Sequence, residues 1–163
     1  MLVTTDWLET VGGLPTHALA VHLVVVGIPA AALASVAVAS RSTWRRRFGW
    51  PVAVVNVLLA VVTQLTAVAG DALLVRSAPT PRMLAHAELG ATVPLLVGAL
   101  ALASIVVVVV DRTPVRWLPA VAAVLVVAAG AVATVQTVRA GHSGAVSVWG
   151  GQWGPVLAED GKR

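Results

Sequence analysis

Long apolar runs alternate with short polar links along the whole chain. The runs, rich in Ala, Val and Leu, cover residues 14–40, 51–75, 83–110 and 114–140. A helix needs about 20 apolar residues to cross a hydrocarbon core about 30 Å thick, so each run is long enough to span a membrane. The links between runs are short and carry charges and prolines, so consecutive helices should be antiparallel neighbours. The pattern predicts an all-α fold, an integral membrane antiparallel four-helix bundle.

Composition supports the membrane assignment and narrows the possible chemistry. Of the 163 residues, 58% are hydrophobic and 11% charged, and the mean hydropathy of +0.91 lies outside the range of soluble domains. We therefore expect a single transmembrane domain over residues 1–163, with a Gly- and Trp-rich outer tail at 141–163. Because the chain has no cysteine, it cannot hold disulfides, thiolate metal sites or iron–sulfur clusters. Any cofactor would be held by His, carboxylate or Met.

Arginines predict the orientation. Arg41, Arg45, Arg46 and Arg47 crowd the first link, whereas the stretch before the first run has no Lys or Arg. The positive-inside rule then places this link in the cytoplasm of a cell-membrane protein, with the N- and C-termini outside. The net charge of +4 comes from arginines beside the apolar runs, which indicates contact with the lipid bilayer rather than with nucleic acid.

Tryptophans are expected at both membrane interfaces, because amphipathic indoles favour headgroup depth. The inner interface would hold Trp44, Trp50 and Trp117, and the outer interface Trp7, Trp149 and Trp153.

The four histidines all fall near the proposed outer ends of the spans. They are His17, His22, His86 and His142. An ionisable side chain in hydrocarbon is costly unless it faces the bundle interior and finds a partner, so a functional site is expected at this depth. At about 100° per residue, His17 and His22 point about 140° apart and cannot both ligate one small ion on a straight helix.

Other polar side chains predict contacts between helices. Asn56, Gln64 and Asp71 share one broad face of the second helix, which we expect to look inward. Asp71 would form an interhelical ion pair with Arg139, and Asn56, Gln64 and Gln136 would form interhelical hydrogen bonds. Pro94 frees a backbone carbonyl in the third span and favours a kink there.

One interpretation of the histidines is a haem b site near the outer face. Two imidazoles from different helices would bind the iron, His22 or His17 from the first span against His86 or His142, with His22 and His86 as the favoured pair. Basic side chains near the same surface would meet the haem propionates, and they are Arg76, Arg82 and Arg139.

Two other interpretations stay open. A site for a Zn, Cu or Fe ion would take imidazole and carboxylate ligands from the set His17, His22, His86, His142, Asp71 and Glu88. Met83 shares a face with His86 and would favour copper. Alternatively the polar side chains only hold the helices together, and the protein is a non-catalytic accessory or assembly subunit of a larger membrane complex.

The order of motifs resembles a known family. It opens with Pro15-Thr-His17 and reaches His22 five residues later, continues with His86-Ala-Glu88-Leu-Gly90, and ends with Arg139-Ala-Gly-His142-Ser-Gly-Ala. This order is similar to that of a family of small four-helix bacterial membrane proteins classed as a domain of unknown function. Here Leu23 and Val24 follow His22, where the family usually has a second Pro.

Some members of that family are fused to a Rieske iron–sulfur domain, which this chain lacks. The resemblance therefore implies a membrane electron-transfer subunit. It would pass electrons between a quinone, or a donor on the outer side, and a separate redox partner protein.

Overall fold

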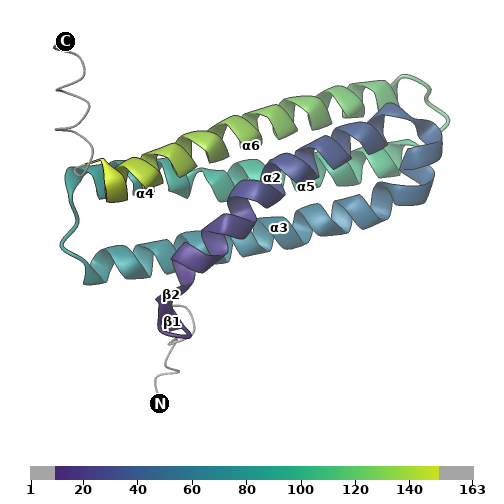
Figure 1. Ribbon diagram of the computed structural model, residues 1–163. Helices are drawn as coiled ribbons and strands as arrows, with labels where there is room; N and C mark the ends of the chain where they lie inside the picture. Colours follow the sequence, from purple (N-terminus) through teal and green to yellow (C-terminus); the bar gives the residue numbers. More distant parts are fainter. Residues whose placement is uncertain (1–9, 151–163) are drawn as a thin grey trace, which may run out of the picture.

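The structure of the protein, a computed structural model, describes residues 10–150 (Figure 1). Two short strands, β1 (Thr10–Val11) and β2 (Leu14–Pro15), lead into the helices. The helices are α2 (Thr16–Ser40), α3 (Ser42–Arg76), α4 (Pro81–Ala91), α5 (Val93–Val110) and α6 (Leu118–Trp149). Within residues 10–150, four helical segments are long and apolar enough to cross a membrane, and one of them consists of α4 and α5 together. The predicted all-α membrane bundle is confirmed.

The spans pack as an antiparallel square. Helix α2 packs against α3 and α6, and α5 packs against the same two helices from the other side. Buried apolar side chains such as Ile28, Val97, Leu100 and Val126 fill the centre. On the outside, side chains such as Leu33 are exposed, as expected of a surface that faces lipid.

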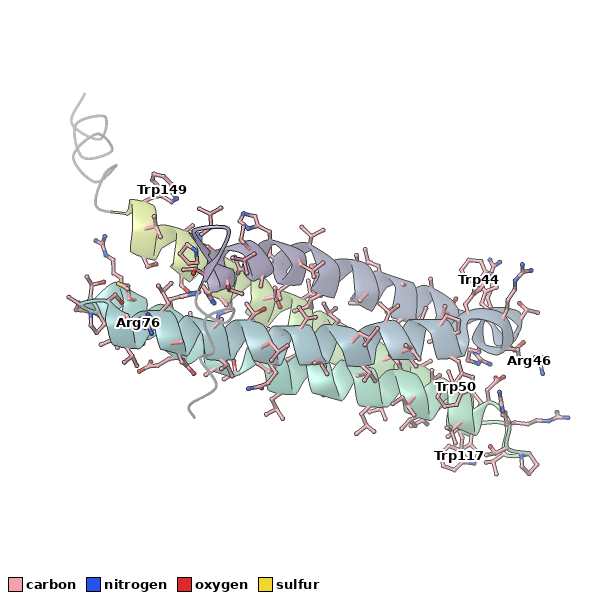
Figure 2. All side chains as sticks on the ribbon, turned by 90° about the horizontal axis from the view of Figure 1, so that it is seen from below. Trp44, Arg46, Trp50, Arg76, Trp117 and Trp149 are labelled. Atoms are coloured by element: carbon pink, nitrogen blue, oxygen red, sulfur yellow. The ribbon has the colours of Figure 1, made fainter. Side chains whose placement is uncertain are left out.

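The two ends of the bundle differ in chemistry. We call the end with the α2–α3 and α5–α6 links the arginine end, and the opposite end, with the α3–α4 link, the histidine end. Trp44, Trp50 and Trp117 lie at the arginine end and Trp149 at the histidine end (Figure 2), and all four side chains are exposed. Trp7 and Trp153 lie outside the described residues.

Two helix boundaries differ from the sequence prediction by about nine residues each. Helix α3 begins at Ser42 rather than at residue 51, so Arg45, Arg46 and Arg47 lie on a helix and not in a loop. At 1.5 Å per residue its 35 residues span about 52 Å, which exceeds a hydrocarbon core of about 30 Å. Helix α6 runs from Leu118 to Trp149, so residues 141–149 continue the helix instead of starting a tail. The rest of the predicted tail, 151–163, lies outside the described residues.

The third span is broken, as Pro94 predicted. Helix α4 ends at Ala91 and α5 begins at Val93, with Thr92 between them. Proline at the second position of α5 has no N–H to continue the ladder. Gln136 of α6 bonds to both sides of the break, because its Nε2 atom donates to the carbonyl oxygen of Leu89 at 3.0 Å and to Oγ1 of Thr92 at 2.8 Å.

A hairpin precedes α2, and the sequence analysis did not anticipate it. Val11 pairs with Leu14 across Gly12 and Gly13, whose φ angles are 60° and 82°. Positive φ at both central residues is what a tight two-residue hairpin turn requires, and glycine adopts it without strain. The hairpin delays the start of the helix to Thr16.

The expected inward face of α3 is correct for Asn56 alone. Asn56 is fully buried and its Nδ2 atom donates to Oγ of Ser35 on α2 at 2.8 Å and to Oγ of Ser104 on α5 at 3.0 Å. Gln64 and Asp71 are exposed. The buried stripe of α3 passes through Thr63, and Gln64 lies one residue, about 100°, beyond it.

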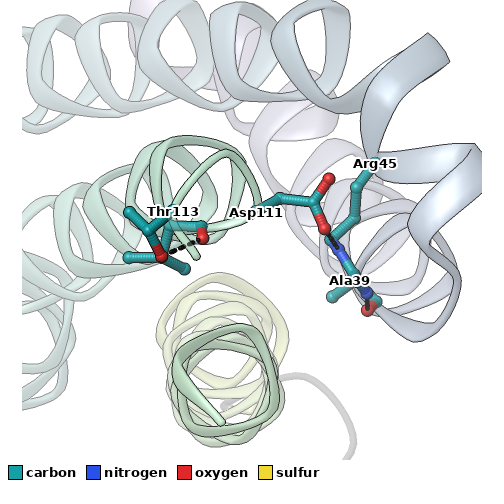
Figure 3. A network of polar contacts seen from close by, with 5 residues as sticks. Ala39, Arg45, Asp111 and Thr113 are labelled. Carbon is teal, nitrogen blue, oxygen red and sulfur yellow. Dashed lines mark hydrogen bonds and ion pairs between the residues drawn. The ribbon is translucent and has the colours of Figure 1, made fainter. Parts of the chain in front are cut away.

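The ion pair also differs from the prediction. Asp71 and Arg139 are both exposed and form no pair, whereas Arg45 and Asp111 do so at the arginine end. Nε of Arg45 lies 2.6 Å from Oδ1 of Asp111, and Nη1 donates to the carbonyl oxygen of Ala39 at 2.6 Å (Figure 3). This contact joins the end of α2, the start of α3 and the end of α5.

Candidate functional site: two imidazoles at the histidine end

His17 of α2 and His86 of α4 meet at the histidine end of the bundle. Their ring centroids are 6.1 Å apart and the ring planes are inclined by 72°. Both side chains are half-buried. The two residues are 69 positions apart in the sequence, and the antiparallel bundle brings them together because the first and third spans point the same way.

A backbone carbonyl of α3 orients the His17 ring. Nδ1 of His17 lies 2.8 Å from the carbonyl oxygen of Thr66. A carbonyl oxygen only accepts, so Nδ1 carries the proton and the neutral ring keeps its lone pair on Nε2. The ring lies against Gly70, where a Cβ atom would come within 2.8 Å of Nδ1. Glycine at position 70 is therefore required for this approach.

Helix α6 orients the His86 ring in the same way. Nδ1 of His86 lies 3.1 Å from the carbonyl oxygen of Ala140 and 3.1 Å from Oγ of Ser143. The Ser143 hydroxyl donates to the same carbonyl at 2.9 Å, so its oxygen accepts from Nδ1–H of His86. The ring lies against Gly144, where a Cβ atom would come within 3.0 Å of Cε1. Again Nε2 is the nitrogen left with a lone pair.

The hydrogen bonds at Nδ1 make these two imidazoles the candidate ligands of the site. A metal-binding histidine generally donates its second ring N–H to a carbonyl or carboxylate, which fixes the tautomer and the ring orientation. Two imidazoles on opposite sides of one metal, at about 2 Å per nitrogen, have centroids roughly 6 Å apart. The observed separation of 6.1 Å agrees with that value.

His22 does not join this pair, which corrects the favoured pairing of His22 with His86. It is exposed, and its Nδ1 atom lies 2.7 Å from the carbonyl oxygen of Ala18 on its own helix. The cause is the angle between the two side chains on α2. His17 faces α3, and His22, which points about 140° away from His17 around the helix axis, faces away from the bundle. His142 is also exposed, on the side of α6 away from His86.

The acidic side chains do not join the pair either. Asp71 and Glu88 are exposed, and Met83, beside the site on α4, is half-buried. Between residues 10 and 150, no three His, Asp or Glu side chains are placed to hold one ion. The expected site of several imidazoles with a carboxylate is therefore not assembled here.

The three arginines predicted near the site do lie at the histidine end. Arg76 ends α3, Arg82 begins α4 and Arg139 lies on the last third of α6, and all three side chains are exposed. Arg82 reaches the end of α6, where its Nη1 atom would lie 3.0 Å from a Cβ atom at Gly150. This end therefore presents cationic side chains from three helices.

Sequence reasoning missed the groups that position the rings. The Thr66 carbonyl cannot be recognised from the sequence. Gly70 and Gly144 could have been noticed, because a glycine in an apolar helix near the level of the histidines is typical of a place where another side chain packs closely against the helix. Ser143 likewise received no role from the sequence. In the structure its hydroxyl oxygen accepts a hydrogen bond from Nδ1–H of His86.

Comparison with known proteins gives one match. The model of the family described as predicted membrane protein DUF2231 matches residues 13–155, a segment that contains His17, His86 and Ser143. No curated protein and no solved structure matches the chain.

Proposed function

The chain belongs to the DUF2231 family of predicted membrane proteins, and from that premise we propose that it is a membrane electron-transfer subunit that binds haem b between His17 and His86. The observation that carries the proposal is the pair of half-buried imidazoles from two spans, 6.1 Å apart. Each ring is held by a carbonyl through Nδ1, which leaves Nε2 as the iron ligand.

The surroundings of the rings fit this cofactor. Gly70 and Gly144 let the two rings lie close against α3 and α6, which supports a fixed orientation of each imidazole. Arg76, Arg82 and Arg139 supply the cationic surface that carboxylates such as propionates favour. His17 and His86 would hold haem b, which would supply one-electron chemistry when bound. The redox partner would be a quinone or a separate protein of a larger membrane complex.

The positive-inside rule supports an orientation. The arginine end bears Arg41, Arg46 and Arg47 on the first link and start of α3, and Arg112 and Arg116 on the second link at that end. We therefore place this end in the cytoplasm and the haem site near the outer face of the cell membrane.

The test is an absorption spectrum of the detergent-purified protein, expressed with sufficient haem and recorded with and without dithionite. The wild-type protein should show a Soret band and a reduced spectrum typical of two axial imidazoles. His17→Gln and His86→Gln should each lose it. His22→Gln and His142→Gln, which change exposed imidazoles, are the matched controls and should keep it.

A second candidate is supported by the same hydrogen bonds. His17 ties α2 to α3, and His86 ties α4 to α6, so the pair also acts as a structural clamp suited to an accessory subunit. In that case none of the five proteins absorbs in the Soret region, and H17Q and H86Q only unfold more easily than the wild type. Stoichiometric Zn, Cu or Fe without porphyrin absorbance would instead favour a two-imidazole ion site.

A further inference from the structure

A lipid-facing groove of about 390 Å³ lies between α2 and α3 near the arginine end. Small side chains such as Ala34 and Ala37 form its α2 wall, and Val52 and Val55 form its α3 wall. Trp44, together with Phe48, lies where the groove reaches the end of the bundle. The lining is apolar almost throughout, so the groove suits a hydrocarbon chain.

The groove runs from the end of the bundle toward its middle. On α3 its wall extends from Trp44 in the first turns to Val55, with Pro51 between them. The exposed indole of Trp44 marks the headgroup level, so the groove extends from there toward the middle of the membrane.

Arginines surround the aromatic end of the groove. The guanidinium carbon of Arg41 lies 5.3 Å from the centroid of the Trp44 ring, and that of Arg47 lies 5.3 Å from the centroid of Phe48. Both arginines are exposed. Their positive charge therefore lies at the end of the groove formed by Trp44 and Phe48, where the headgroup of a lipid with its acyl chain in the groove would lie.

No acidic side chain neutralises this charge among the described residues of the arginine end. Asp111 is the carboxylate there, and it is already paired with Arg45. Arg46 adds a further exposed cation. A bound anion would neutralise this positive charge.

We infer that this groove is a binding site for one anionic phospholipid, with an acyl chain between α2 and α3 and the phosphate at Arg41 and Arg47. Basic sites beside membrane helices recognise anionic headgroups through charge. A zwitterionic lipid would fill the same groove but gain less, because its own cation faces the same arginines. The site lies at the opposite end of the bundle from the histidine pair and is independent of haem.

The headgroup is tested by native mass spectrometry of the full chain, purified in detergent and mixed with phosphatidylglycerol or phosphatidylcholine of the same acyl chains. At equal concentration, phosphatidylglycerol should give at least fivefold more of the one-lipid adduct. The double variant Arg41→Gln/Arg47→Gln should remove this preference. The control variant Arg112→Gln/Arg116→Gln removes the same amount of charge from the α5–α6 link and should keep the preference for phosphatidylglycerol. An equal loss in both variants, or no loss in either, overturns the site.

The groove is tested with a variant that fills it and leaves the charge unchanged. Ala34→Leu should reduce the phosphatidylglycerol adduct severalfold, whereas Ala131→Leu, on the exposed side of α6, should not. Both positions are exposed, so neither change should disturb the core. If A34L binds as the wild type does, the lipid is held by headgroup charge alone and the groove is not its site.

Discussion

Single glycines decide whether the two imidazoles can approach the neighbouring helices. His17 reaches the Thr66 carbonyl only because position 70, one turn later on α3, has no Cβ. His86 reaches the Ala140 carbonyl across Gly144 in the same manner. At Asn56, by contrast, one polar atom is left unsatisfied: Nδ2 donates two hydrogen bonds, but Oδ1 is buried without a partner.

Gly70→Ala should therefore displace the His17 ring while both histidines are kept. The new methyl would lie 2.8 Å from Nδ1 of His17, so the ring must move and its bond to Thr66 must weaken. Overpacking of this kind costs about 1–3 kcal/mol. We expect a lower unfolding midpoint in detergent and, if haem is bound, a changed Soret band.

Gly98→Ala is the matched control, because a Cβ atom there meets nothing within 4 Å. Alanine is the better helix former, so this variant should be as stable as the wild type or slightly more so. Equal destabilisation by the two substitutions would show that the contact with His17 is unimportant.

Among the elements, the third span depends most on its neighbours. The break between α4 and α5 leaves the Leu89 carbonyl without its usual helical donor, and Gln136 of α6 supplies one. The side chain of Thr92 also takes part, since it donates to Leu89 and accepts from Gln136. Because His86 lies on α4, this contact helps to hold α4 against α6 at the histidine pair.

Gln136→Leu should destabilise the protein by about 0.6–1.7 kcal/mol, from the average to the maximum measured for hydrogen bonds between membrane helices. Unfolding by a denaturing detergent in mixed micelles would measure the loss. Gln64→Leu makes the same chemical change at an exposed site on α3 and should cost nothing. A loss in Q64L as large as that in Q136L would contradict this role of Gln136.

At the scale of the whole molecule, polar contacts at three depths join helices that lipid would otherwise separate. The Arg45–Asp111 pair lies at the arginine end, the Asn56 cluster lies deeper in the bundle, and the His17–His86 pair lies at the histidine end. Apolar contacts alone do not drive helices together in hydrocarbon, so packing of small residues and these contacts provide the specificity.

The proposed orientation predicts the location of both ends of the bundle. Alkaline phosphatase fused after residue 163 should be active in bacteria, because it folds outside the cytoplasm, and a green fluorescent protein at the same place should be dark. The fluorescent protein inserted after Thr113, in the link at the arginine end, should fluoresce. The reverse pattern would place the histidine pair on the cytoplasmic side.

The number of spans, their antiparallel order and the depth of the histidines follow from the apolar runs, because length and hydropathy suffice to define a helix in a membrane. Asn56, Gln136 and the break near Pro94 were also predictable, since a polar or helix-breaking residue in hydrocarbon must find compensation. The choice of His17 over His22, the exposure of Asp71 and the Arg45–Asp111 pair came only from the tertiary structure. These depend on how each helix is rotated about its axis, and that rotation is set by packing against three other helices, which no single run of sequence contains.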